Sequence, residues 1–463
     1  MVGFIVHSPD QFTYIFSQGK PTIESLPTDI IVLILFQIPD IPSVRSLVRA
    51  SPIWHHVYLA VRQRILRFHL NQEFESLAID PAEAITALRS QGLYLRTYRE
   101  EAIALLDAWR RHQEIAELAL TPSIRVDQPR DFEEVIDLLH YCRQLRFFLE
   151  DFSINAICPQ WMSSTQWNDN LPLRLSQTEQ TRFMRAVCRL QIHTNIFGPA
   201  LKNPYTVSRA ADYRNFWQGF CPRDQMEPAY QLFHGAMPTW EYDEIASLVP
   251  YFEDKYRAIC SEIDADLRKL WELPCPPHLG HPSGTSGISV HGRDREPRPS
   301  LEEYLTAPNY PLYVYDISES SSMFDMESQL VIFGPKFLYC VLHMTYTLRR
   351  DYILKNYTTG RGGWAFADID HNYRSRLPFI YPADRHDTHD YKLLWSTLSP
   401  TEQPSGVWKR LNLPKLGRDA DLSLREALVD RHGRSPSWAW AYAIWDMKRV
   451  RMWETPPRHV TPA

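Results

Sequence analysis

The chain has 463 residues, a formal net charge of −5, 44% hydrophobic residues and 13% aromatic residues. This length predicts one large or two moderate domains, and the apolar content excludes wholesale disorder. A net negative charge provides no basic face of the kind that nucleic acid requires, so we expect no nucleic-acid partner.

The cysteines and the N-terminus predict an intracellular protein. Seven cysteines are dispersed along the chain without a Cys-x-x-Cys pair, which is typical of reduced thiols. The first residues lack a basic leader, and their apolar run is too brief for a signal peptide. No segment of the sequence is long and apolar enough to cross a bilayer. We therefore expect a cytoplasmic or nuclear protein that has no membrane partner.

Residues 22–66 carry the start and stop signals of three short helices. Pro27 lies in the first turn of the first helix, where its missing N–H costs nothing, and Pro39 follows the end of that helix. Asp40 is placed to cap the second helix. Ser51 and Pro52 begin the third helix, whose apolar residues recur at helical spacing.

The first of these helices is apolar on all sides. Residues 30–36 read Ile-Ile-Val-Leu-Ile-Leu-Phe without a polar break, which is typical of a helix that is buried all round. The run is too short to span a membrane. Two short neighbouring helices can cover only one of its faces, so the pattern predicts a second face that needs a partner.

The order and spacing of these residues resemble the F-box, the three-helix module by which substrate receptors of SCF ubiquitin ligases bind the SKP-family adaptor. The resemblance is carried by Leu26, Pro27, Asp29, Ile30, Ile34, Leu35, Ile38, Pro42, Val44, Leu47, Ser51 and Trp54. It implies an adaptor-binding surface, and through the adaptor a cullin scaffold. The implied adaptor contacts are Leu26, Pro27, Ile30, Ile34, Leu35, Ile38, Pro42, Val44, Leu47 and Trp54. The alternative interpretation is a set of helices buried in the protein's own core.

Beyond an N-terminal extension (1–21) and this module (22–66), residues 67–463 predict a large, irregular, mainly helical body. Periodicity predicts helices over 79–88, 99–118, 132–142, 239–259 and 326–354, and a capping box at Ser176 begins another that ends before Gly198. The Pro/Gly-rich stretch 273–299 predicts a loop. Residues 313–315 are the only expected strand. The fold class is therefore mainly α with little or no strand.

The C-terminal third is rich in tryptophan. A second capping box at Ser423 predicts a helix that ends at Gly433, and residues 438–446 predict a final aromatic helix. The Trp-x-Trp-x-Tyr-x-x-Trp-Asp ending and the 175–197 segment resemble a large group of fungal F-box-like proteins, which has no assigned reaction. Trp and Tyr at helical spacing are typical of a core rather than of a ligand cage.

Several groups of residues were considered as chemical sites. Gly360–Ala365 matches Gly-x-Gly-x-x-Ala, but the helical pattern before it favours a loop over a dinucleotide site. Cys275, His278, His281 and His291 are separated by Pro and Gly residues that give no framework for tetrahedral zinc. Core packing explains Cys340 and His343 better than nucleophilic catalysis does.

The densest polar cluster contains Asp368, Asp370, His371, His386, Asp387, His389 and Asp390. Such side chains can bind metal or move protons, but they can also form a hydrated loop. We favour the hydrated loop. We therefore predict no catalytic residue, cofactor or metal.

The sequence thus favours a non-catalytic receptor of an SCF-type ligase that holds an unknown client protein with its helical body. Two alternatives stay open: an F-box scaffold that has no role in ubiquitination, and a metal-dependent enzyme with an appended F-box.

Overall fold

The computed structural model describes residues 23–112, 124–199, 228–272, 327, 330–356, 395, 398–412 and 438–453. Helices make up 74% of the described residues, and these residues contain no strand, so the mainly α prediction is confirmed. The predicted strand at 313–315, the loop at 273–299 and the helix after Ser423 lie outside the described residues.

Contacts between Cα atoms divide the chain into two compact units. The first unit contains Met1–Ser76 and Arg130–Leu139, and the second contains Leu77–Pro129 and His140–Ala463. The first unit is larger than the predicted 22–66 module because the third helix does not end near residue 66.

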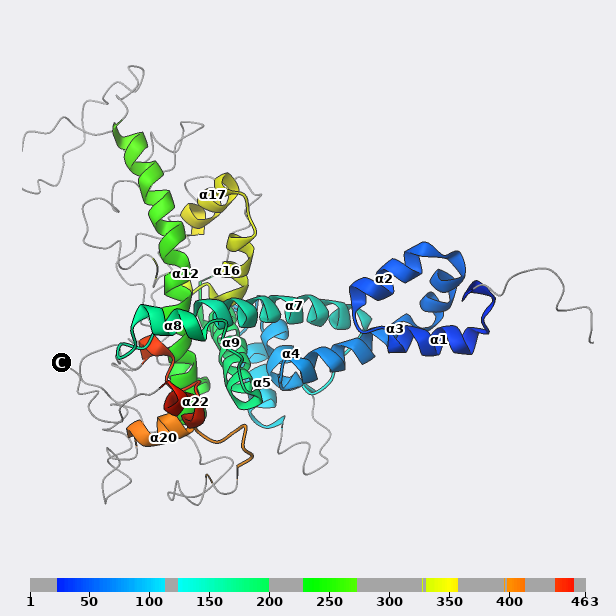
Figure 1. Ribbon diagram of the computed structural model, residues 1–463, viewed down its shortest axis with the longest axis horizontal. Helices are drawn as coiled ribbons and strands as arrows, with labels where there is room; N and C mark the ends of the chain where they lie inside the picture. The colour runs from blue at the N-terminus through cyan, green and yellow to red at the C-terminus, as the bar shows by residue number, and fades with distance from the viewer. Residues whose placement is uncertain are drawn as a thin grey trace, which may run out of the picture. The chain divides into compact units, whose positions relative to one another are not determined.

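In the described part of the first unit, three consecutive helices are joined by short turns (Figure 1). A 3-10 turn, η2 (Ile23–Ser25), precedes α1 (Thr28–Gln37), α2 (Ile41–Ala50) and α3 (Pro52–Ser76). The predicted punctuation is confirmed, since Pro27 and Pro52 lie at helix starts and the Asp40 carboxylate accepts a 2.7 Å hydrogen bond from the Ser43 backbone N–H. Such a cap satisfies one of the free N–H groups of the first turn.

The remaining helices of the described residues belong to the second unit, apart from the start of α7, which belongs to the first unit. They are α4 (Pro81–Arg89), α5 (Arg99–Arg110), α7 (Phe132–Asn155), α8 (Ser164–Asn170), α9 (Gln177–Phe197), α12 (Thr239–Glu272), α16 (Gly334–Leu342), α17 (Tyr346–Asn356), α20 (Gly406–Asn412) and α22 (Met447–Met452). The described part of this unit also contains the 3-10 turns η3 (His234–Ala236) and η6 (Trp438–Trp440).

Helix α9 is the centre of the second unit, because α4, α12 and α16 all pack against it. The predicted capping box is confirmed: Ser176 Oγ accepts from the Glu179 backbone N–H, and Glu179 accepts from the Ser176 backbone N–H. Every α9 residue from Arg182 to Thr194 is buried, as expected of a helix covered by several neighbours.

Aromatic side chains fill the space around α9. Phe152 of α7 lies against Phe183 of α9 and stacks on Trp445, with ring centroids 4.7 and 5.4 Å apart. Phe148 of α7 meets Phe252 of α12 edge to face. These contacts confirm the prediction that the described aromatic residues at helical spacing belong to a core.

Three helix predictions are wrong. The helix predicted over 99–118 ends at Arg110, because Arg111 leaves the α-helical conformation, and residues 113–118 lie outside the described residues. Residues 326–354 do not form one helix: Pro335, which lacks an N–H, lies in the first turn of α16, that helix ends at Leu342, and α17 begins at Tyr346. Residues 438–446 form a 3-10 turn and further turns instead of an aromatic helix, and Ala441 takes a positive φ of 56°. A left-handed residue interrupts an α-helix, so the regular helix begins only at Met447.

Candidate functional site

The first candidate site is the apolar surface of the three-helix module. Its core consists of Ile31, Leu35, Val44, Val48, Trp54, Val57 and Ile65. Helix α1 gives only Ile31 and Leu35 to this core, although seven consecutive residues of that helix are apolar. The rest of its apolar surface is therefore only partly covered.

Three of the implied adaptor contacts belong to the module's own core. Leu35 and Trp54 are 0% exposed and Val44 is 2% exposed, so an outside protein cannot touch them without unfolding the module. Their interpretation as direct contacts is corrected here. They hold the three helices together and thereby position the surface residues.

The other seven implied contacts reach the surface. Pro27, Ile30 and Pro42 are exposed. Four more are half-buried around the core, namely Leu26, Ile34, Ile38 and Leu47. Ile30 and Ile34 lie one turn apart on α1, so they share a face of that helix.

The structure adds an exposed residue that the sequence analysis did not select. Leu33 is 59% exposed and lies three residues after Ile30, which is 41% exposed. Together with Ile34 these residues form a continuous apolar strip, which we call the α1 strip (Ile30, Leu33 and Ile34). Helical spacing from Ile30 was the signal that could have identified Leu33.

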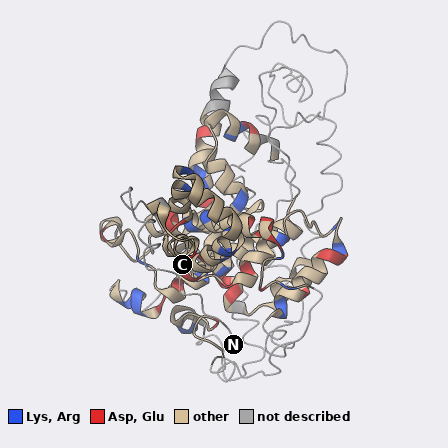
Figure 2. Cartoon of the chain, turned by 90° about the vertical axis from the view of Figure 1, so that its right-hand side faces the viewer, with Lys and Arg blue, Asp and Glu red and all other residues tan. Residues whose placement is uncertain are grey.

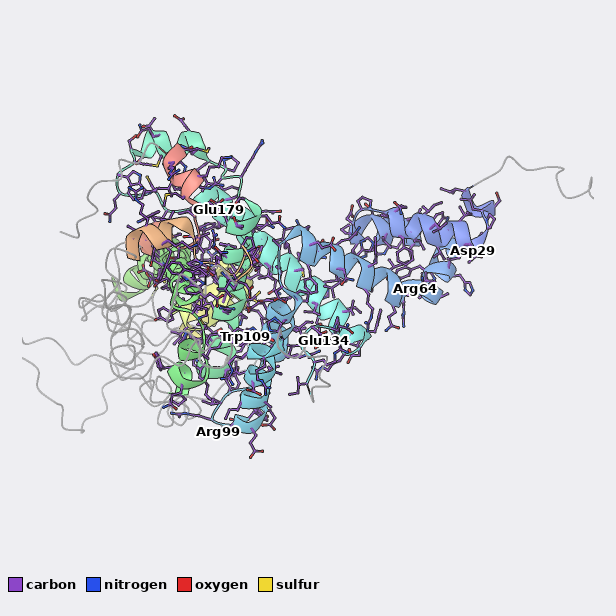
Figure 3. The ribbon with its side chains drawn as sticks, turned by 90° about the horizontal axis from the view of Figure 1, so that it is seen from below. Asp29, Arg64, Arg99, Trp109, Glu134 and Glu179 are labelled. Atoms are coloured by element: carbon purple, nitrogen blue, oxygen red, sulfur yellow. The ribbon has the colours of Figure 1, made fainter. Side chains whose placement is uncertain are left out.

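Charge does not dominate this module or the body. Lys and Arg residues are interspersed with Asp and Glu residues along the described helices (Figure 2). Asp29 lies at the start of α1 and Arg64 on α3 (Figure 3). The distinguishing property of the α1 strip is therefore its apolar character.

The second candidate site is a series of buried ion pairs in the second unit. The Arg185 guanidinium donates Nε–H to Glu244 Oε2 at 2.8 Å and Nη2–H to Glu244 Oε1 at 2.6 Å. Its Nη1 lies 3.3 Å from Glu241 Oε1. The other Glu241 oxygen accepts from Arg189, whose Nε and Nη2 also donate to Glu83 Oε1 at 2.9 and 2.8 Å.

We call this chain of contacts the ion-pair ladder (Glu244, Arg185, Glu241, Arg189 and Glu83). It joins three helices, because the arginines lie on α9, Glu241 and Glu244 on α12, and Glu83 on α4. All five residues are less than 9% exposed. Burial favours the neutral guanidine, yet the carboxylates of Glu241 and Glu83 outweigh it and raise the pKa of Arg189.

A further pair of arginines ties the C-terminal segment to α9. Arg182 donates to Asp446 Oδ1 at 2.8 Å and to the carbonyl oxygen of Ile444 at 3.0 Å. Arg449 donates to Glu179, which is 0% exposed. Here each guanidinium meets one carboxylate, so these contacts are balanced in charge.

The ion-pair ladder borders a cavity of about 190 Å³. Glu83, Arg185, Arg189 and Glu241 line one part of this cavity, and Trp109 and His112 line another. Trp109 lies on α5 (Figure 3), and the Arg189 guanidinium stands 5.1 Å from the centre of its ring. The cavity is large enough for several water molecules or for one short side chain.

Glu83 and Trp109, which line the cavity, each have a buried polar atom that has no hydrogen-bond partner among the described residues. These atoms are Glu83 Oε2 and Trp109 Nε1, on side chains of residues that are 4% and 5% exposed. Burial raises the pKa of Glu83 above its ordinary value, and Arg189 opposes this effect only in part. An unpartnered buried acceptor is costly, and this oxygen has almost no accessible surface.

The sequence analysis did not predict the ion-pair ladder. Glu241 and Glu244 pair with arginines, and Asp243 accepts from Trp408 and Tyr442 at 2.7 Å. Arginines at helical spacing within the largely apolar α9 were the available signal, since buried charges need partners.

The described residues do not support the other sequence-based sites. No group of His, Cys, Asp and Glu able to hold a metal ion occurs among them. Burial raises the pKa of the Cys340 thiol, and the exposed His343 ring packs against Tyr339 at 4.1 Å, so this pair is no activated nucleophile. The 275–291 residues, Gly360–Ala365 and the 368–390 cluster lie outside the described residues.

Within the described part of the chain, no helix is both long enough and apolar enough to cross a bilayer. Comparison of the chain with models of protein families, with curated proteins and with solved structures finds no match.

Proposed function

We propose that the three-helix module binds an SKP-family adaptor, and that the helical body holds a client protein for an SCF-type ubiquitin ligase. The chain itself contributes no catalytic group in this proposal. The cullin scaffold brings in a conjugating enzyme that carries ubiquitin, and the chain holds the client's lysines close to it. The chain thereby promotes ubiquitin transfer through proximity alone.

The observation that carries this proposal is the exposed α1 strip on a module whose core is already complete. Ile30 and Leu33 are 41% and 59% exposed. They lie outside the core of the module, which contains Trp54, Leu35 and Ile31. Two large aliphatic side chains on one helix face are costly to leave in water, and each contributes about 1.5–3 kcal/mol when fully buried. The F-box resemblance names the kind of partner that would cover them.

The shape of the module also supports a docking role. The prolines at the starts of α1 and α2 and the Asp40 cap fix where each helix begins, so the strip is presented on rigid elements. Binding energy in such an interface is concentrated in a few central apolar anchors. We expect Ile30 and Leu33 to be among them.

The test is co-purification of the full-length protein with an SKP-family adaptor. The Ile30→Asp variant should weaken the complex at least about tenfold, because it places a charge in an apolar contact. The Ile154→Asp variant is the matched control, since Ile154 is a 54% exposed isoleucine of the body. Unchanged adaptor binding by Ile30→Asp would contradict the proposed docking.

A point substitution suits this test better than deletion of residues 22–66. Helix α3 continues to Ser76, so such a deletion would leave a truncated helix in its first unit. Affinity capture from cells with the proteasome blocked should then compare the wild type with Ile30→Asp. Partners lost from the variant belong to the ligase, and partners kept by it are candidate clients. If Ile30→Asp loses the ligase and yet no client accumulates in cells, the protein would be a scaffold that has no role in ubiquitination.

A further inference from the structure

His112 lies two residues after the end of α5, and its ring contacts two different helix ends. Its Nδ1 is 2.5 Å from the carbonyl oxygen of Trp109, in the last turn of α5. Its Nε2 is 3.2 Å from Asp80 Oδ2, and the other oxygen of Asp80 caps α4 by accepting from the Ala82 backbone N–H. Helices α4 and α5 pack against each other, and this ring connects the N-terminal end of α4 with the C-terminal end of α5.

Both atoms that face the ring are hydrogen-bond acceptors. A carbonyl oxygen has no proton to donate, and an aspartate carboxylate has none while it is ionised. A neutral imidazole has a single N–H and can donate to only one of them, whereas the imidazolium donates to both. The helix ends favour the same charges, because a cation is stabilised at a helix C-terminus and an anion at a helix N-terminus. The geometry therefore favours the protonated ring.

The formal charge of the cavity wall favours the same proton. The wall holds four carboxylates and three guanidiniums, namely Asp80, Glu83, Glu241, Glu402, Arg110, Arg185 and Arg189. His112 lines the cavity as well, and its imidazolium is the fourth cation. The charged neighbours behind the wall, Asp107 with Arg111 and Asp127 with Arg125, form pairs that add no net charge. Loss of the His112 proton therefore leaves the wall with one negative charge in excess.

Water reaches both members of this pair, since the side chains of His112 and Asp80 are 18% and 43% exposed. Burial by itself would lower the pKa of His112, but the hydrogen bond and the charge of Asp80 outweigh burial and raise that pKa above its ordinary value. Burial by itself would raise the pKa of Asp80, but the hydrogen bond and the charge of His112 outweigh it and lower that pKa. Each side chain therefore favours the charged form of the other.

We propose that His112 is a proton-controlled clasp, which as the imidazolium holds the N-cap of α4 to the last turn of α5 and which releases one of these two contacts when it loses its proton. The raised pKa of His112 sets the sign of the pH dependence. The clasp is complete below the pKa of about 6.5 that an unperturbed histidine has, and it is lost as the pH rises through the higher pKa of the folded protein. The packing of α4 on α5 should therefore loosen as the pH rises.

The first experiment follows the His112 ring of the full-length protein by NMR as the pH is changed, with carbon-13 at the Cε1 atoms of its histidines. The His112 signal is the one that disappears in His112→Gln. We expect it to titrate above about pH 6.5, the value of an unperturbed histidine. Asp80→Asn should move the titration to lower pH, because asparagine caps a helix as well as aspartate does but carries no charge. Titration of His112 at or below about pH 6.5, or unchanged titration in Asp80→Asn, would overturn the proposal.

The second experiment measures amide hydrogen exchange in α4 and α5 at about pH 6 and about pH 8, with the rates corrected for the intrinsic pH dependence of exchange. In the wild type we expect exchange to be at least about threefold faster at the higher pH, because one contact of the clasp has been lost. His112→Gln has no such proton to lose, so its corrected rates should be the same at both pH values. Equal rates in the wild type, or a wild-type difference in His112→Gln, would contradict the clasp.

His343→Gln is the matched control. The His343 ring also follows a helix, α16, and its Nδ1 lies 2.8 Å from the carbonyl oxygen of Tyr339, but it has no carboxylate partner among the described residues. This variant should keep the wild-type pH dependence of exchange in α4 and α5. Equal loss of that dependence in His343→Gln and His112→Gln would refute the assignment.

Asp80→Asn provides a second exchange test that does not depend on the folding of His112→Gln. It keeps a capping side chain on α4 and removes the charge that holds the proton on His112. Its exchange should therefore differ less between the two pH values than that of the wild type. An undiminished difference in Asp80→Asn would show that another group controls the packing, and it would overturn the proposal.

Discussion

Replacing Arg189 with methionine is the most informative perturbation of the body. Arg189 is 8% exposed and is shared by Glu83 and Glu241, so its removal leaves two buried carboxylates with less compensation. The ladder would then hold three carboxylates against Arg185 alone. Removing one partner of a buried ion pair costs about 3–5 kcal/mol, which is a large part of a typical folding free energy.

The cost is measurable by urea unfolding at neutral pH, followed by the fluorescence of the 14 tryptophans. Arg64→Met is the matched control: Arg64 is an exposed arginine of α3 whose guanidinium lies 5.8 Å from the centre of the Phe36 ring, and its loss should cost at most about 1 kcal/mol. Combining Arg189→Met with Glu83→Gln should cost less than the sum of the single changes, since the second change removes a charge that the first leaves unpaired. A cost for Arg189→Met no greater than that of the control would refute the argument.

Three further predictions concern stability. Leu35→Ala should lower the unfolding free energy of the three-helix module by about 2–5 kcal/mol, seen as faster amide exchange in α1 to α3, because Leu35 is 0% exposed. Gly334→Ala should lower the free energy of unfolding in urea by at least about 1–3 kcal/mol, because φ is +84° and a Cβ would overlap Thr194 Oγ1. Ala78→Gly, at φ +51°, should raise that free energy by up to about 1 kcal/mol. Burial lowers the pKa of His193 from 6.5 to about 3, so the unfolded chain takes up its proton first. The free energy of unfolding therefore does not depend on His193 protonation above about pH 6.5, and it falls by up to about 1.4 kcal/mol per pH unit as the pH drops toward 3. His193→Gln should flatten this pH dependence.

Local signals were sufficient for the helix boundaries that capping and proline control. Pro27, Asp40 and Ser176 act on backbone groups within three residues of themselves, and the structure confirms each of them. The 438–446 segment had no such signal. Its aromatic spacing suits a helix equally well, and the turns around Ala441 become apparent only where Trp440 and Trp445 enter a core built by other helices.

The ion-pair ladder lay beyond local reasoning for the same reason. Glu83 and Arg189 are 106 residues apart, and Arg189 and Glu241 are 52 apart. Composition and spacing indicate that a buried arginine needs a partner, but they do not select which carboxylate supplies it. That choice is made when α4 and α12 pack against α9.

The sequence by itself determined the helical class, the three-helix module and the apolar excess of α1, because caps, prolines and periodicity act over a few residues. Only the tertiary structure decided that Leu35, Val44 and Trp54 face inward while Ile30 and Leu33 remain in water, and that one oxygen of Glu83 stays unpaired beside a cavity. Burial and pairing depend on what neighbouring helices cover, and contacts between residues far apart in the chain set that coverage.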